Sequence, residues 1–226
     1  MLTGVESLER GAVDRLATLT YAVVDVETTG GSPLRGHRVT EVAVVVVRDG
    51  RIHDCFETLV NPERSIPSYI SRLTNITQDM VRHQPVFAAI APRLSALLGG
   101  AVFVGHNAKF DHRWVRTESA WAGVDIPSGR VLCTVRLARR LLPHLRRRSL
   151  DHIAHHYGVP ITNRHRAMGD AMATAKCFVR LLDDAGSHGL DTWDDLRGLT
   201  AKRSGAARRR RQQLALPFGG EWELGA

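Results

Sequence analysis

Residues 21–30 have the sequence YAVVDVETTG, an apolar run that ends in two carboxylates. Its β-branched residues are typical of a buried strand, which the threonines and glycines after Glu27 should end. Asp25 and Glu27 are two positions apart, so on a strand their side chains share one face. Burying ionised carboxylates without a partner is costly, and the stretch holds no Lys or Arg. One hypothesis is a metal ion held by both acids, and the other is a strand that simply runs out into a polar turn.

The neighbouring segments predict the rest of a sheet. Residues 39–48 and 51–60 predict two strands, joined at Asp49-Gly50 by a type I′ hairpin signal. Apolar residues 101–104 and 131–133 predict two short strands that alternate with helices. The predicted helices cover residues 85–98, 107–122, 134–142, 149–157 and 167–182. The expected fold class is therefore α/β, with a mixed five-stranded sheet (a three-strand antiparallel meander plus two parallel strands) flanked by helices.

The length of 226 residues suits one α/β domain with additional tail. Composition changes after residue 184, where Gly, Ser, Asp and Arg dominate. We therefore expect an N-terminal lead-in at residues 1–17, a domain at 18–184, and a basic, largely flexible tail at 185–226.

The net charge of +8 comes almost entirely from arginine. Such a balance favours a polyanionic partner such as nucleic acid, although coding bias also enriches arginine. No apolar run is long enough to span a membrane, and the N-terminus does not resemble a secretory signal. The three scattered cysteines, Cys55, Cys133 and Cys177, favour reduced thiols. We expect a cytoplasmic protein with no membrane partner.

Two further segments place acids where helices begin. In GHNAKFD, residues 105–111, Asp111 lies in the first turn of a predicted helix, and Asp170 lies similarly, five residues after His165. An acid in a first turn is also stabilised by the helix dipole alone. In open α/β folds, however, such strand and helix ends converge on one crevice. Hard oxygen ligands without cysteine suit Mg²⁺ or Mn²⁺.

The order Asp-x-Glu, Asn-x-x-x-Phe-Asp and His-x-x-x-x-Asp resembles the three motifs of the DEDD exonuclease superfamily, in its histidine-bearing (DEDDh) branch. The likeness spans residues 21–182 and is greatest to the proofreading epsilon subunit of bacterial DNA polymerase III and to PolC-type exonuclease segments. The resemblance implies an RNase H-like fold and a 3′→5′ exonuclease that hydrolyses phosphodiester bonds at DNA 3′ ends, in replication proofreading or repair.

The resemblance also implies roles for individual residues. Asp25, Glu27 and Asp170 would hold one divalent ion, Mg²⁺ or Mn²⁺. Asp25 would bridge to a second such ion, which Asp111 helps to bind. His165 would act as the general base, which is a task suited to an imidazole.

The substrate contacts are expected around these acids. The residues implied are Thr28, Thr29 and Gly30 at the terminal nucleotide, His106, Asn107 and Phe110 along the cleft, and Ile76 as a wedge against the terminal base. The sequence departs from the family pattern at Cys133, where an acid is common, and at Asn75, where glycine is usual. These departures bear on fine substrate preference rather than on catalysis.

Two alternatives stay open. The same catalytic residues serve 3′→5′ exoribonucleases or oligoribonucleases of the superfamily, and substrate comparison separates these from a DNA enzyme. A non-catalytic nucleic-acid-binding module would keep the fold as a scaffold but has no need of all five residues.

Arginines and a short peptide indicate further partners. Arg146, Arg147 and Arg148 are expected either to contact phosphates of the incoming strand or to form a solvated face. Residues Gln213–Phe218, QLALPF, resemble short peptides that bind the bacterial sliding clamp, which they would do through apolar side chains in a preformed pocket. A DNA polymerase is the other expected partner.

Overall fold

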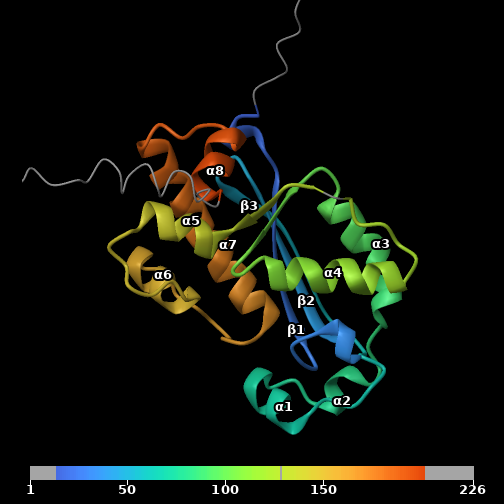
Figure 1. Cartoon of the computed structure of the whole chain (residues 1–226). Helices are drawn as coiled ribbons and strands as arrows, with labels where there is room; N and C mark the ends of the chain where they lie inside the picture. Colours follow the sequence, from blue (N-terminus) through green and yellow to red (C-terminus); the bar gives the residue numbers. More distant parts are fainter. Residues whose placement is uncertain (1–13, 128, 202–226) are drawn as a thin grey trace, which may run out of the picture.

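The structure is a computed structural model that describes residues 14–127 and 129–201. Its centre is one sheet with the strand order β3-β2-β1-β4-β5 (Figure 1). The strands are β1 (Tyr21–Thr28), β2 (Val39–Arg48), β3 (Arg51–Leu59), β4 (Val102–Gly105) and β5 (Val131–Cys133). β1, β2 and β3 pair antiparallel, whereas β1 with β4 and β4 with β5 pair parallel. The predicted mixed sheet is thus confirmed.

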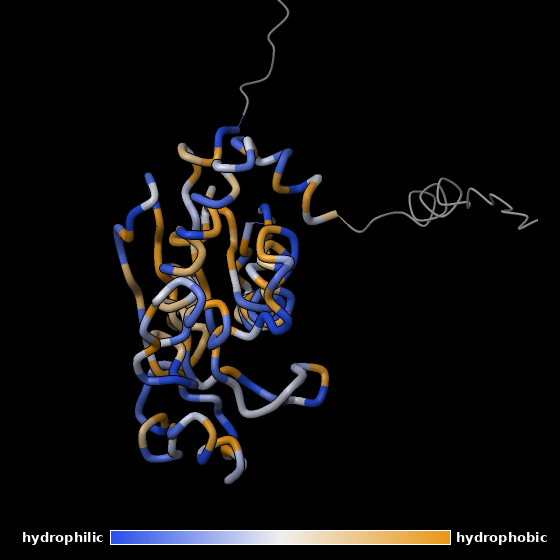
Figure 2. Tube along the Cα trace, turned by 90° about the vertical axis from the view of Figure 1, so that its left-hand side faces the viewer, coloured by the Kyte–Doolittle hydropathy of each residue, from blue (hydrophilic) through white to orange (hydrophobic). Residues whose placement is uncertain are grey.

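Helices cover both faces of this sheet. One face packs against α5 (Thr134–Leu141), α6 (Leu150–Tyr157), α7 (Ala167–Ser187) and α8 (Trp193–Thr200). The other face packs against α3 (Phe87–Leu98) and α4 (Lys109–Trp121). Alternation along β1 produces the two cores, because Tyr21 and Val23 point to the first face and Ala22 and Val24 to the second. Figure 2 shows the hydrophobic colours concentrated along the strands and on the helices beside them.

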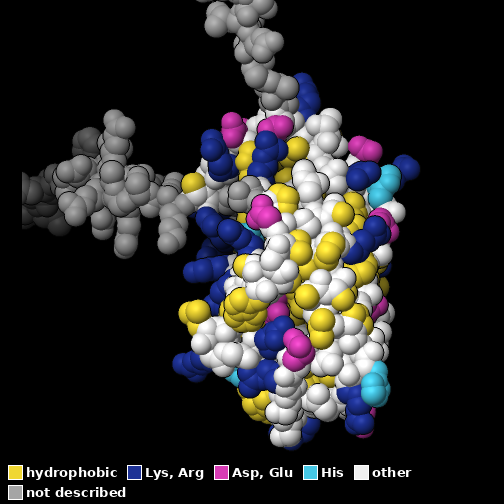
Figure 3. All heavy atoms as spheres, turned by 90° about the vertical axis from the view of Figure 1, so that its right-hand side faces the viewer, with side chains coloured by type: hydrophobic (Ala, Val, Ile, Leu, Met, Phe, Trp, Pro, Cys, Tyr) yellow, Lys and Arg dark blue, Asp and Glu magenta, His cyan; other side chains and the backbone are white. Residues whose placement is uncertain are grey.

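Short elements close the ends of the sheet. The short 3₁₀ helix η2 (Pro33–Arg35) lies between β1 and β2, and η1 (Leu16–Thr18) precedes β1. Helices α1 (Ser68–Thr74) and α2 (Gln78–Val81) project beyond the end at which β1 stops (Figure 1). Thr77 caps α2 by accepting a hydrogen bond from the backbone N–H of Met80. On the face in Figure 3, Lys and Arg side chains gather along one edge.

The packed structure continues past residue 184, where the domain is expected to end. Residue 184 lies inside α7, which runs on to Ser187, and α8 buries Leu196 completely in the first core. Arg15 forms a bridge with Thr192, so the segment before β1 joins the segment between α7 and α8. The composition after residue 184 does not indicate this extension, because a short helix that buries one leucine is otherwise polar. The expected clamp peptide at residues 213–218 lies outside the described residues.

No helix in the described part of the chain is both long and apolar enough to cross a membrane.

Replacing Leu196 by Ala tests whether α8 belongs to the folded unit. We expect a loss of about 2–5 kcal/mol in the free energy of unfolding, since a fully buried leucine is removed from a packed core. Urea unfolding followed by circular dichroism measures it. Leu34, which is 95% exposed, supplies the control, and Leu34→Ala should change stability by less than about 0.5 kcal/mol. Equal, small effects of the two substitutions would contradict the assignment.

Candidate active site at the end of strand β1

Strand β1 places two acids at the edge of a core. Tyr21 and Val23 pack beneath α7, and Asp25 and Glu27 continue along the same face toward the end of the strand. In the antiparallel register Glu27 lies opposite Glu41 of β2. The face that begins as hydrophobic core therefore ends in a group of carboxylates, as the sequence predicts for Asp25 and Glu27.

Asp111 reaches the same point from the start of α4. It is 3% exposed, and its Oδ1 accepts a hydrogen bond from the backbone N–H of Val26 at 3.3 Å. The helix can begin this close to β4 because Gly105 has no side chain, since a Cβ there would lie 2.9 Å from the Cα of Ala108. The hydrogen bond ties Asp111 to Val26, the residue between Asp25 and Glu27, although Asp111 belongs to a helix on the opposite face of the sheet.

Asp170 comes from the first turn of α7 and is 5% exposed. Its Oδ2 accepts a hydrogen bond from the backbone N–H of His165 at 3.3 Å and also pairs with the guanidinium of Arg164. Arg164 donates a second hydrogen bond, from Nε to Oδ1 of Asp151, at 3.1 Å. Arg164 is not among the site residues predicted from the sequence, although it precedes His165 directly in the chain.

Burial raises the pKa values of these acids, and repulsion between them adds to the shift of Asp25 and Glu27. Burial raises the pKa of Asp25 well above its usual range, and the charges of Asp111, Glu27 and Asp170 raise it further. Burial, followed by the charge of Asp170, raises the pKa of Glu27 to about 8. Burial raises that of Asp111 to about 7. Arg164 lowers the pKa of both acids of β1, but one guanidinium does not balance four carboxylates.

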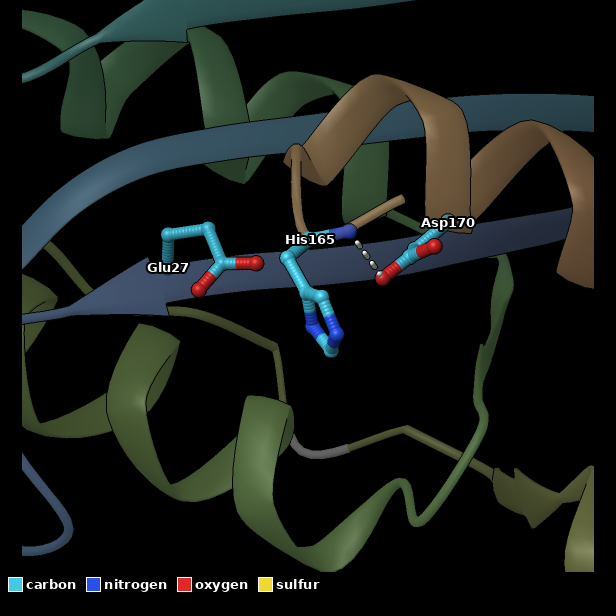
Figure 4. A group of neighbouring side chains, drawn as sticks. All are labelled: Glu27, His165 and Asp170. Carbon is cyan, nitrogen blue, oxygen red and sulfur yellow. Dashed lines mark hydrogen bonds between the residues drawn. The ribbon is translucent and has the colours of Figure 1, made fainter. Parts of the chain in front are cut away.

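The donor set fits a divalent cation. Glu27, His165 and Asp170 each offer one ligand atom, and these atoms lie within 4.8 Å of one another. Figure 4 shows the imidazole of His165 lying between the two carboxylates. The Oδ1 atom of Asp170 is buried without a hydrogen-bond partner, which leaves a lone pair for an ion. Asp25 lies close enough to Glu27, Asp111 and Asp170 for their charges to raise its pKa, so further carboxylate oxygens are available as hard ligands.

A buried ion pair holds the start of α7 against the sheet. Glu41 is completely buried and accepts hydrogen bonds from Nε of Arg166 at 3.0 Å and from the backbone N–H of Ala167 at 2.8 Å. The carboxylate satisfies a backbone donor that the helix leaves free and lies where the helix dipole favours an anion. Glu41 thus fixes the end of the helix that carries Asp170. A sequence signal existed, because an acid inside the apolar run VTEVAV needs a partner.

A second buried glutamate repeats this arrangement on the other face. Glu118 of α4 is 1% exposed and accepts hydrogen bonds from Nε of Arg38 at 3.0 Å and from the backbone N–H of Val39 at 2.9 Å. In both arrangements, which we call glutamate–arginine clamps, the carboxylate binds an arginine and the backbone N–H of the residue after that arginine. Glu118 fixes the start of β2, as Glu41 fixes the start of α7.

The loop that carries His165 packs closely on α7. A Cβ on Gly169 would collide with the carbonyl oxygen of Thr162 and would lie 2.6 Å from that of Asn163. Asn163 and His165 both adopt the left-handed conformation, with φ values of 54° and 62°. The absence of a side chain at Gly169 therefore lets the loop turn tightly enough to bring His165 over the acids.

The residues after Glu27 form a closed turn. Thr28 Oγ1 donates a hydrogen bond to the carbonyl of Gly30 at 2.7 Å, and Thr29 Oγ1 accepts one from the backbone N–H of Arg38 at 3.0 Å. Gly30 lies against the ring of His37, which a Cβ would approach to 2.5 Å. These three residues, predicted to contact the terminal nucleotide, are buried, and the hydroxyls of Thr28 and Thr29 are hydrogen-bonded within the turn.

The other predicted substrate residues differ in exposure. His106 is partly buried with Nδ1 2.9 Å from Oγ1 of Thr134, and burial lowers its pKa to about 4. Asn107 is exposed in a left-handed turn with φ 77°, and Phe110 is partly exposed at the start of α4. Ile76 is only 1% exposed, so a wedge at this position would require its surroundings to open.

Replacing Glu41 by Gln tests the clamp on α7. We expect a loss of about 1–3 kcal/mol in the free energy of unfolding, because Gln keeps one acceptor but leaves Arg166 without its counter-charge. Amide hydrogen exchange should quicken at residues 163–167. Glu118→Gln is the matched control, since it should destabilise to a similar degree and quicken exchange near Val39 instead. The same exchange pattern in both variants would show that Glu41 has no local effect on the loop.

Comparisons with known proteins agree with this geometry. Residues 22–178 match the model of the RNase_T family, which is described as an exonuclease family. The chain is 37% identical over 163 residues to the 3′-5′ exonuclease DinG of Bacillus subtilis (strain 168), a match that covers 72% of this chain and 18% of that protein. It is 36% identical over 179 residues to the PolC-type DNA polymerase III of Clostridium perfringens (strain 13 / Type A), covering 77% and 12%. The chain thus spans less than a fifth of either relative.

Among solved structures, exonuclease X in complex with 5′ overhanging duplex DNA is similar, with a TM-score of 0.63 and 27% sequence identity. The match covers 81% of this chain and 100% of that chain. The arrangement of sheet and helices is accordingly RNase H-like, as the motif resemblance implies.

Proposed function

This chain belongs to the RNase_T exonuclease family, and from that premise we propose that it is a metal-dependent exonuclease that shortens DNA from the 3′ end. The observation that carries the proposal is the group of four acids with one imidazole at the end of β1. The product of each cycle is a nucleoside 5′-monophosphate and a strand one nucleotide shorter. Proofreading or repair of DNA is the proposed cellular role.

The metal ligands proposed are Asp25, Glu27 and Asp170 for one ion, with Asp25 bridging to a second ion that Asp111 helps to bind. Two Mg²⁺ or Mn²⁺ ions at these residues would offset the acids' charge and stabilise the attacking and leaving oxygens of the phosphodiester. The raised pKa values support this assignment, because such carboxyls need a concentrated positive charge to stay ionised near neutral pH.

The protein's own groups supply the proton transfer and the positioning. A water oxygen attacks the terminal phosphorus, the bond from phosphorus to the 3′-oxygen breaks, and His165 accepts the proton that the water loses. The leaving 3′-oxygen takes its proton from solvent. Gly169 and the Glu41–Arg166 pair keep the loop and helix that carry His165 and Asp170 in register with β1.

The substrate and partners are proposals of the same kind. Thr28, Thr29 and Gly30 would meet the terminal nucleotide through the backbone of their turn. His106, Asn107 and Phe110 would line the path of the strand. A DNA polymerase is the proposed partner, in keeping with the name of the PolC-type relative. Sliding-clamp binding through Gln213–Phe218 and a cytoplasmic location remain predictions from the sequence.

An activity assay with labelled ends tests the proposed function. With Mg²⁺ or Mn²⁺, 5′-labelled single-stranded DNA and mismatched primer-template should shorten progressively, and 3′ blocking should stop the reaction. Asp25→Ala should lower the rate by at least about 10³-fold, because the proposed bridge between the ions is lost. Arg93→Ala, on the exposed side of α3, should leave the rate unchanged.

Two results would decide against this function. If RNA of equal length is shortened faster than DNA, the chain is an exoribonuclease of the same superfamily. If the Asp25→Ala protein is as active as the unchanged chain, the acids do not carry catalysis and the binding-module alternative gains support.

Thermal unfolding with and without metal tests the ligand assignment separately. Metal should raise Tm in a concentration-dependent way, because ligands that bind only the folded state stabilise it. Asp25→Asn should raise the Tm of the metal-free protein, since it removes one repelling charge, and should abolish most of the metal-induced rise. His165→Gln should keep the metal-induced rise if His165 acts as a base. Loss of the rise in His165→Gln would make it a ligand instead.

A further inference from the structure

A cavity lies along α6, and the proposed catalysis uses none of the residues that line it. It has a volume of about 800 Å³ and lies along the exposed side of α6 and the loop that precedes it. Its lining consists of Leu145, Arg146, Arg147, Asp151, His152, His155 and His156. A cavity of this size is large enough for a small organic ligand such as a nucleotide.

The charges of the lining favour an anion. Arg146 and Arg147 are exposed, and neither forms an ion pair with any residue that the structure describes. The single carboxylate in the lining, Asp151, is already engaged by Arg164. Two guanidinium groups without counter-charge, in a hollow without a free acid, are a site for phosphate.

Flat rings add a second kind of contact. His156 packs against the ring of His144, with centroids 5.1 Å apart, and against the ring of Tyr157, with centroids 4.8 Å apart. His152 is held by Ser149, whose Oγ lies 2.6 Å from its Nδ1. His155 is exposed on the same side of the helix. Imidazole rings that line a hollow beside arginines offer surfaces on which a base can stack.

Arg148 does not belong to this set, although it follows the two other arginines in the chain. Its guanidinium turns inward and donates hydrogen bonds to the carbonyls of Leu142 and Pro143 at 3.3 and 3.2 Å. Arg148 thereby shapes the loop, and the expected row of three phosphate-binding arginines becomes two. The hydrogen bonds of Arg148 therefore stabilise the backbone of the loop that carries Arg146 and Arg147.

The cavity is connected to the acids by two consecutive ion pairs. Asp151 lines the cavity and binds Arg164, and Arg164 in turn binds Asp170. Helix α6 also packs directly on α7, which carries Asp170. An occupant of the cavity would thus lie against Asp151, with Arg164 between it and Asp170.

We propose that this cavity binds an internal nucleotide of the single-stranded DNA substrate, with its phosphates on Arg146 and Arg147 and its base against the histidines of α6. This rests on the proposed function for the identity of the strand. A strand held at a second point would be retained as its end is shortened. The assigned ligand class is a phosphate with an attached base, which a released nucleoside monophosphate also has.

Fluorescence anisotropy of the full chain in EDTA tests the proposal without degrading the strand. The probes are a dinucleotide, an oligothymidylate of about ten nucleotides and a nucleoside monophosphate. The double variant Arg146→Gln/Arg147→Gln should bind the long probe about tenfold more weakly, and its salt slope should fall by about 1.4. Binding of the dinucleotide should not change. His155→Ala should weaken binding of the long probe about fivefold with an unchanged salt slope.

Arg48→Gln/Arg93→Gln is the matched control, because it removes the same charge beside α3, which packs on the other face of the sheet from α6. It should bind the long probe as the unchanged chain does. An unchanged salt slope in Arg146→Gln/Arg147→Gln, or equal weakening in the control, would overturn the proposal. Loss of monophosphate binding alone would overturn it in favour of a product site. Failure of the unchanged chain to shorten any DNA would count against the proposed function, while the EDTA result would still decide whether the cavity binds DNA.

Discussion

Repulsion between buried carboxylates is the constraint on which this structure depends. Four acids from three separate segments meet at the end of β1, where burial raises the pKa of each and the charges of the neighbouring acids raise those of Asp25 and Glu27 further. Such a group would spread apart in a loosely packed fold. Here the acids are carried by a central strand and by the first turns of two helices, so the hydrophobic cores on both faces of the sheet hold them together.

The two glutamate–arginine clamps show how the fold resists that repulsion. Glu41 and Glu118 are themselves buried acids, but each has a guanidinium and a backbone N–H to satisfy it. They differ from the acids of the candidate site in this respect. Asp170 keeps an oxygen without a partner, and the guanidinium of Arg164 is shared between Asp170 and Asp151. The fold thus neutralises the acids that position its elements and leaves incompletely neutralised those that face the site.

Much of this could be predicted from the sequence, because the signals are local. The strands around YAVVDVETTG follow from β-branched runs and a hairpin dipeptide, and Asp25, Glu27, Asp111, His165 and Asp170 follow from acids and a histidine at element ends in a familiar order. The clamps could not be assigned, because Arg166 and Glu41 lie 125 residues apart and nothing local pairs them. The inward turn of Arg148 and the burial of Ile76 depend on packing that neighbouring sequence does not specify.

The pairing of the segment before β1 with the start of α8 has a consequence for architecture. Arg15 and Thr192 form a bridge, and the backbone N–H of Trp193 donates to the carbonyl of Asp14 at 2.9 Å. This junction lies by the beginning of β1, whereas the acids lie at its far end. A unit whose first segment is tied down at the pole opposite the acids can follow another domain in a longer polypeptide without the preceding linker crossing the site. This arrangement is compatible with the relatives, in which the matching segment is a small part of a much longer protein.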